Sequence, residues 1–315
     1  MPHALTNFEA SRIYSDRVLE QLRGNLEKVL GSRSFMIGTN GSFARRDASE
    51  QSDLDYFVLC TTEAEVDDVK AQMEQVKPEI LRVVPKPPSS GGAFETVESL
   101  ESMLTNIGGR GDGNDKFTRR MLFLLEGEWL YNEPVLEHVR DRLLEKYIRD
   151  TISDHQIALF LLNDIIRYYR TICVDFEFKT HEDGKEWGVR NIKLVFSRKL
   201  LYFSGILAVA ETYRQTAPAK RARLKELFAM PVVDRIYSVC GSRADHALSF
   251  YDEFLGEFAK ADVREACREI KEEDRDKSPI FRGLKNRGHL FSGRLHHLLQ
   301  DIYEAGHPIH RALIL

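Results

Sequence analysis

The strongest constraint on the fold of this chain is the run TNGSFARRDASEQSDLDYFVL, in which Gly41-Ser42 and Asp53-Leu54-Asp55 are separated by ten residues. The two carboxylates open an apolar stretch that is typical of a strand. Because alternate residues of a strand point to the same face, we expect Asp53 and Asp55 to project together. Two like charges held this close are costly unless a cation lies between them. Carboxylate oxygens suit Mg²⁺, so the pattern predicts a Mg²⁺ (or Mn²⁺) site.

The residues around the Gly-Ser pair predict the elements that would hold it. Residues 34–38 and 54–59 are expected to form strands, with a turn between the first of them and a short helix that begins at Ser42. Glycine permits close backbone approach and a helix start presents free N–H groups, so Gly41 and Ser42 predict a phosphate site. Arg45 would add positive charge. The alternative is a purely structural cap beside a buried strand, with Arg45 solvated.

This pattern of Gly-Ser, ten residues and Asp-x-Asp resembles the signature of the DNA polymerase β-like nucleotidyltransferase superfamily, and its ungapped spacing favours the bacterial minimal nucleotidyltransferase branch. The resemblance implies an ATP-binding transferase that uses Mg²⁺ to move a nucleoside monophosphate from an NTP to an acceptor, with release of pyrophosphate. ATP is the expected donor. By this resemblance Gly41 and Ser42 hold the triphosphate, while Asp53 and Asp55 are catalytic metal ligands.

Members of this superfamily usually carry a third carboxylate on a later strand. We expect residues 79–84 and 93–97 to form an antiparallel pair of strands, joined by a turn-rich segment. Glu95 would then face the site as a third catalytic metal ligand. Glu98 and Asp112 are alternatives, and so is the absence of any third acid, which would leave a binding-only form of the fold.

Expected strands are confined to the first part of the chain, and the rest is expected to be helical. This pattern predicts an α+β protein with two domains, for which 315 residues are sufficient. Residues 1–133 would form a small mixed-sheet nucleotidyltransferase domain, with an N-terminal helix over 6–31 and a further helix over 117–130. Residues 134–315 would form an all-helical, substrate-binding domain. Related enzymes often supply a lysine from a helix to the outer phosphates, which makes Lys193 the candidate here; the alternative is an ion pair with a nearby acid.

Composition limits the expected partners and the cellular compartment of the chain. A net charge of −4 argues against a protein that coats DNA, and the four cysteines lack the spacing of a zinc site or a disulfide framework. No apolar run approaches the roughly 20 residues that span a bilayer, and no signal peptide is evident, so we expect a cytoplasmic protein without a membrane partner.

The acceptor stays open among a protein hydroxyl, a tRNA or other RNA end, and a small molecule, with the near-neutral charge tilting towards protein or small molecule. An alternative of another class is a catalytically silent, nucleotide-binding regulatory module. A toxin–antitoxin or phage-defence component is a further role that the same residues allow. The oligomeric state is not indicated by the sequence.

Overall fold

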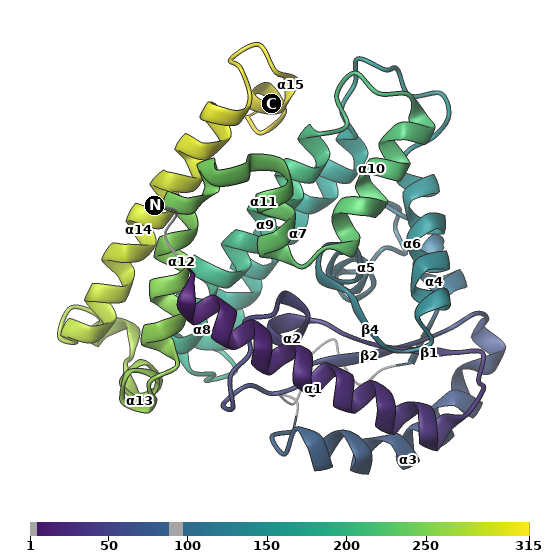
Figure 1. Ribbon diagram of the computed structural model, residues 1–315, viewed down its shortest axis with the longest axis horizontal. Coiled ribbons are helices and arrows are strands. Elements are labelled where there is room, and N and C mark those ends of the chain that lie inside the picture. The colour runs from purple at the N-terminus through teal and green to yellow at the C-terminus, as the bar shows by residue number, and fades with distance from the viewer. Residues whose placement is uncertain (1–4, 88–96, 315) are drawn as a thin grey trace. The chain divides into compact units, whose positions relative to one another are not determined.

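The computed structural model describes residues 5–87 and 97–314, and the chain divides into two compact units (Figure 1). The sheet unit comprises Ala10–Thr151 with Leu224–Pro231. The helical unit comprises Ile152–Arg223 and Val232–Leu315, together with the N-terminal residues up to Glu9. The described part of the helical unit contains no strand, so the expected α+β class is confirmed.

The first long helix, α1 (Thr6–Leu30), confirms the helix expected over 6–31. Leu19, Leu22, Leu26 and Leu30 are all buried. Their spacing of three or four residues places them on one face, which is the face that packs on the sheet.

Four short strands form a mixed sheet in the order β3-β2-β1-β4. The strands are β1 (Met36–Thr39), β2 (Tyr56–Cys60), β3 (Val97–Ser99) and β4 (Glu128–Tyr131). Strand β1 is antiparallel to both β2 and β4, whereas β2 and β3 are parallel. Thr39 lies opposite Tyr56, so the end of β1 and the start of β2 meet at the same end of the sheet.

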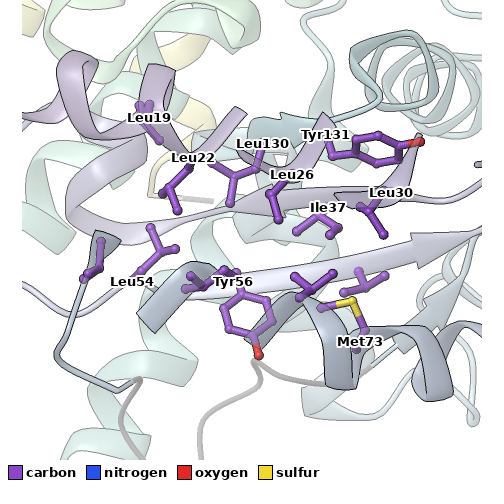
Figure 2. Packing of buried hydrophobic residues seen from close by; sticks show 14 of the residues in the cluster. Leu19, Leu22, Leu26, Leu30, Ile37, Leu54, Tyr56, Met73, Leu130 and Tyr131 are labelled. Carbon is purple, nitrogen blue, oxygen red and sulfur yellow. The ribbon is translucent and has the colours of Figure 1, made fainter. Parts of the chain in front are cut away.

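Both faces of the central strands are covered. Figure 2 shows Ile37 and Tyr56 in the apolar cluster that the sheet shares with α1 and with Met73 of α3 (Val66–Val83). On the other face Phe57 makes an edge-to-face contact with Phe123, with ring centroids 5.8 Å apart. A strand covered on both faces carries apolar residues along its whole length, as β2 does.

The strand expected over 79–84 is wrong, because α3 continues to Val83. Met73, Val76 and Ile80 are buried at helical spacing, and this apolar stripe outweighs the interruption by Pro78. The antiparallel pair expected between this segment and 93–97 is therefore also absent. Strand β3 instead pairs in parallel with β2.

The helix expected over 117–130 is too long at its C-terminal end. Helix α5 (Asn114–Glu126) ends before Gly127, and the four residues after Gly127 form β4. Trp129 pairs with Gly38 of β1, so pairing with a distant strand overrides the local apolar periodicity.

The remaining helices of the sheet unit are short or flank the sheet: α2 (Gly41–Arg45), α4 (Leu100–Leu104) and α6 (Glu133–Tyr147). The division into units counts α6 with the sheet, whereas the predicted domain boundary at 133/134 places it with the helical part; that boundary stays a prediction.

The helical unit is built on a long segment in which α8 (Trp187–Lys193) passes through a π-helical turn (Leu194–Arg198) into α9 (Lys199–Ala210). Phe196 of the π-helical turn stacks on Phe254 and Phe291, with centroid distances of 4.3 and 5.5 Å. The other α-helices of this unit are α7 (Leu159–His181), α11 (Val232–Cys240), α12 (Asp245–Phe258), α13 (Ala261–Glu269), α14 (Pro279–Ile302) and α15 (Pro308–Ala312). Helix α10 (Ala217–Ala229) begins in the helical unit, and its residues from Leu224 onward belong to the sheet unit. Among the described residues of the whole chain, no helix combines the length and apolar character needed to cross a membrane.

Candidate metal and nucleotide site

The turn after β1 is tied directly to the segment that leads into β2. The backbone N–H of Asn40 donates to the carbonyl oxygen of Asp55 at 3.0 Å, and the hydroxyl of Thr39 donates to the same oxygen at 2.7 Å. These bonds follow from the antiparallel register, which brings the two segments to one end of the sheet. The Gly-Ser turn and the second aspartate are therefore neighbours in space.

Gly41 leaves room for the side chain of Asp55. Its φ is +73°, in the left-handed region, and a Cβ atom built on it would lie 2.9 Å from Oδ2 of Asp55. Any larger residue would meet both the unfavourable φ and this carboxylate. The glycine thus accommodates an aspartate of the chain itself, in addition to the ligand role that the sequence predicted for it.

Asp53 and Asp55 lie in the extended segment immediately before β2, and both are half-buried. Leu54 between them is 1% exposed and belongs to the apolar cluster shown in Figure 2. Since neighbouring side chains of an extended segment alternate, the two aspartates point away from that cluster. A role for both as metal ligands stays a prediction.

A fully buried glutamate, Glu126, also reaches the turn, and the sequence analysis missed it. Its Oε1 accepts the backbone N–H of Gly41 at 3.1 Å, and its Oε2 accepts a hydrogen bond from Arg45 at 2.6 Å. Glu126 ends the apolar run MLFLLE of α5. A single acid at the end of such a run is the signal that could have identified it.

Arg45, predicted to bind nucleotide, is 7% exposed and contacts two carboxylates. Its Nε lies 3.0 Å from Asp47 Oδ2, and a terminal nitrogen binds Glu126. These contacts brace the short helix α2 against α5. A role in binding nucleotide stays a prediction for this arginine.

The three candidates for the third carboxylate have different surroundings. Glu95 lies outside the described residues. Glu98, on β3, forms an ion pair with Arg119. Asp112 is 6% exposed and accepts two hydrogen bonds from the guanidinium of Arg120, at 3.0 and 2.8 Å, so its visible role is in the packing of the unit.

Two further observations concern ligands. Within 5–87 and 97–314 no group of three or more acidic, histidine or cysteine side chains is arranged to hold a metal ion. The side-chain oxygen of Asn40 is buried and accepts no hydrogen bond from the described residues. Buried polar atoms are nearly always satisfied in folded proteins, so this oxygen, in the turn itself, is suited to a missing donor or cation.

Ser42 and Lys193 complete the predicted set. Ser42 is half-buried, and its hydroxyl makes no hydrogen bond to any residue that the structure describes. It can therefore donate to a ligand. Lys193 is an exposed residue at the end of α8 in the helical unit, and its predicted role is untested.

Comparison with known proteins adds no family to these observations. No protein-family model matches the chain, and no curated protein matches it. The resemblance to the nucleotidyltransferase superfamily thus rests on the residues of the Gly-Ser and Asp-x-Asp pattern.

Proposed function

We propose that the chain is a Mg²⁺-dependent nucleotidyltransferase that moves a nucleoside monophosphate from an NTP, with ATP the expected donor, to an acceptor hydroxyl or phosphate. The observation that carries this proposal is the contact between the Gly-Ser turn and Asp55 of the Asp-x-Asp pair. Because Gly41 has no side chain, the Asp55 carboxylate can lie against it, and the Asn40 N–H donates to the Asp55 carbonyl oxygen. A phosphate held at the turn would consequently lie beside the carboxylates that bind its counter-ion.

The residues divide the chemistry between them. Asp53 and Asp55 would hold the cation, which supplies positive charge to the phosphate oxygens. In the transfer the acceptor oxygen forms a bond to the α-phosphorus, the bond to the pyrophosphate oxygen breaks, and the acceptor proton leaves to solvent or to a carboxylate. The Ser42 hydroxyl would donate to a phosphate oxygen. The N–H of Gly41 binds Glu126, so the contribution of Gly41 would be the close approach of a phosphate to a backbone that carries no side chain.

The proposal is tested by transfer of label from each of the four α-³²P NTPs with Mg²⁺ in a cell lysate. We expect labelled acceptor with the wild-type chain and none with the Asp53→Ala/Asp55→Ala double variant. Asp67→Ala is the matched control, because Asp67 is an exposed acid of the same unit. The acceptor is identified by whether label enters protein, RNA or a small molecule. Equal labelling by wild type and double variant would overturn the proposal.

The alternative function is a silent module that binds nucleotide without turnover. It is favoured by the lack of a three-acid group among the described residues. Two results together would support it: a folded wild-type chain binds ATP at equilibrium but labels no acceptor, and the Asp55→Ala variant binds ATP with the same affinity. A toxin or defence role would be indicated by growth arrest on expression that Asp53→Ala relieves.

A further inference from the structure

Two lysines of the helical unit are each hydrogen-bonded to a neutral side chain between α14 and the continuous segment α8–α9. Lys199 of α9 donates to the hydroxyl oxygen of Ser292 on α14 at 2.6 Å. Lys285 of α14 donates to the side-chain oxygen of Asn191 on α8 at 2.7 Å. We call these two contacts rungs: α14 supplies the lysine of one and the acceptor of the other, and the continuous segment α8–α9 supplies their partners.

Both lysines are half-buried, and neither forms an ion pair with an acid in the described parts of the chain. Removing an ammonium group from water is costly, and proteins usually offset this cost with a carboxylate. A hydroxyl and an amide oxygen satisfy one N–H of each ammonium but carry no negative charge. The positive charge of the pair is therefore not neutralised.

The electrostatics of the pair agree with this description. Burial lowers the pKa of Lys199. Burial also lowers the pKa of Lys285, and the positive charges of Lys199 and Arg275 lower it further. The positive charge of Lys199 thus disfavours the charged form of Lys285, and a bound anion would offset this effect.

The helices that carry the lysines are fixed against each other. Gly288 of α14 lies so close to Val195 of the π-helical turn that a Cβ atom at position 288 would overlap the valine side chain. This contact falls between the two rungs in sequence on both helices. A π-helical turn inserted in an α-helix is often found at functional sites.

The spacing of the rungs sets the size of a suitable ligand. Asn191 and Lys199 are eight residues apart, and Lys285 and Ser292 are seven apart. At 1.5 Å per residue the two rungs are separated by about 10–12 Å along the helices. One orthophosphate is too small to contact both ammonium groups without moving them, whereas two linked phosphate groups have the length and the charge.

We propose that Lys199 and Lys285, with Ser292 and Asn191, form a binding site for linked phosphate groups of the pyrophosphate class. The source is either a free pyrophosphate or polyphosphate, or the phosphate tail of a nucleotide. The site lies within the helical unit, and this inference does not depend on the activity proposed for Asp53 and Asp55.

The test is isothermal titration of the full chain with pyrophosphate, orthophosphate and ADP, in EDTA. It is made on the Asp53→Ala/Asp55→Ala background, so that the proposed metal site does not contribute. We expect pyrophosphate to bind at least tenfold more tightly than orthophosphate, and Lys199→Met and Lys285→Met each to weaken it at least tenfold. ADP binding more tightly than pyrophosphate would identify a nucleotide as the source.

Lys260→Met is the matched control, because it removes one positive charge from an exposed lysine of the same unit that already pairs with Glu257. We expect its affinity for pyrophosphate to equal that of the parent chain. An equal loss in this variant would show binding through general charge and would overturn the proposal. Absence of binding to the parent chain, or unchanged binding by both Lys199→Met and Lys285→Met, would overturn it as well.

A second readout separates binding from a structural role. Methionine keeps most of the lysine's apolar stem and removes an uncompensated charge, so each variant should unfold at the same or a higher temperature than the parent without ligand. Pyrophosphate should raise the unfolding temperature of the parent and not of the variants. A clear loss of stability in the variants without ligand would assign the lysines to the fold instead.

Discussion

The carboxylate of Glu126 accepts a hydrogen bond from the backbone N–H of Gly41, with 3.1 Å between Oε1 and the nitrogen. The same carboxylate binds Arg45, and its side chain is fully buried. One acid at the end of α5 therefore fixes both the first residue of α2 and the charged side chain at its end. The conformation of the Gly-Ser turn depends on this group.

Glu126→Gln is expected to destabilise the chain by about 3 kcal/mol, since it leaves the buried guanidinium of Arg45 with less negative charge. The measurement is the free energy of unfolding in urea. Glu128→Gln is the control, because Glu128 pairs with Arg23 and Arg46 at a partly exposed position and should cost about 1 kcal/mol. A loss for Glu126→Gln no larger than that for Glu128→Gln would contradict the assigned role.

Gly41→Ala is expected to cost more than Gly108→Ala. Both glycines have a φ in the left-handed region, +73° and +77°, but a Cβ atom at position 108 would meet nothing within 4 Å. Alanine at position 108 should therefore cost about 1 kcal/mol from backbone strain alone. At position 41 the contact with Asp55 adds to this, for a total of about 2–3 kcal/mol. Equal losses in urea unfolding would show that Asp55 moves aside freely.

Two glycines of α14 should respond to alanine with opposite signs. Gly293→Ala meets nothing within 4 Å and should stabilise the helix by about 0.5–1 kcal/mol. Gly288→Ala would overlap Val195 and should destabilise by about 1–3 kcal/mol. Thermal unfolding of the two variants measures both effects. A stabilised Gly288→Ala chain would mean that α14 and the π-helical turn are not held at this distance.

His307 should make the stability depend on pH. Burial lowers the pKa of His307, with His310 and Arg214 lowering it further against Glu211 and Glu304, and its Nδ1 accepts the N–H of Ile309 at 3.2 Å. The unfolded state, with an ordinary pKa of about 6.5, then binds the proton more readily than the folded state. The stability contributed by the neutral ring is present above about pH 6.5 and is lost as the pH falls below it.

The corresponding measurement is the free energy of unfolding between pH 7 and pH 5. The His307→Asn chain keeps a side-chain oxygen for the N–H of Ile309 and should lose less stability over this range than wild type, with a difference in slope of at most about 1.4 kcal/mol per pH unit. His297→Asn replaces an exposed histidine and should follow the wild-type curve. Parallel curves for wild type and His307→Asn would refute the prediction.

The sequence predicted the helices and strands whose apolar residues repeat with a clear local period. The leucines of α1 repeat with a helical period, and the apolar run of β2 follows its two aspartates, so both elements were predictable. Residues 79–84 and β4 were not, because a helix continues past Pro78 in the first case and a distant strand pairs with Trp129 in the second. In both places tertiary packing decides between conformations that the local sequence allows.

The contacts of the candidate site also differ in whether the sequence could predict them. The closeness of Gly41 and Asp55 follows from two neighbouring strands of the sequence, β1 and β2, that pair with each other, and it could be predicted. The bond between Arg45 and Glu126 joins residues 81 positions apart, and no periodicity connects them. The lysines at 199 and 285 were missed for the same reason, since each is unremarkable until its partner on the other helix is known.

The division of the chain into units has a consequence for synthesis. The sheet unit includes Leu224–Pro231, which follows Ile152–Arg223 of the helical unit in sequence, and Leu224, Leu227 and Phe228 of this segment are buried. A nascent chain that has emerged only as far as Thr151 lacks these residues. The unit that carries Asp53 and Asp55 thus completes its packing only after most of the polypeptide has left the ribosome, and a fragment ended at Thr151 would expose apolar surface.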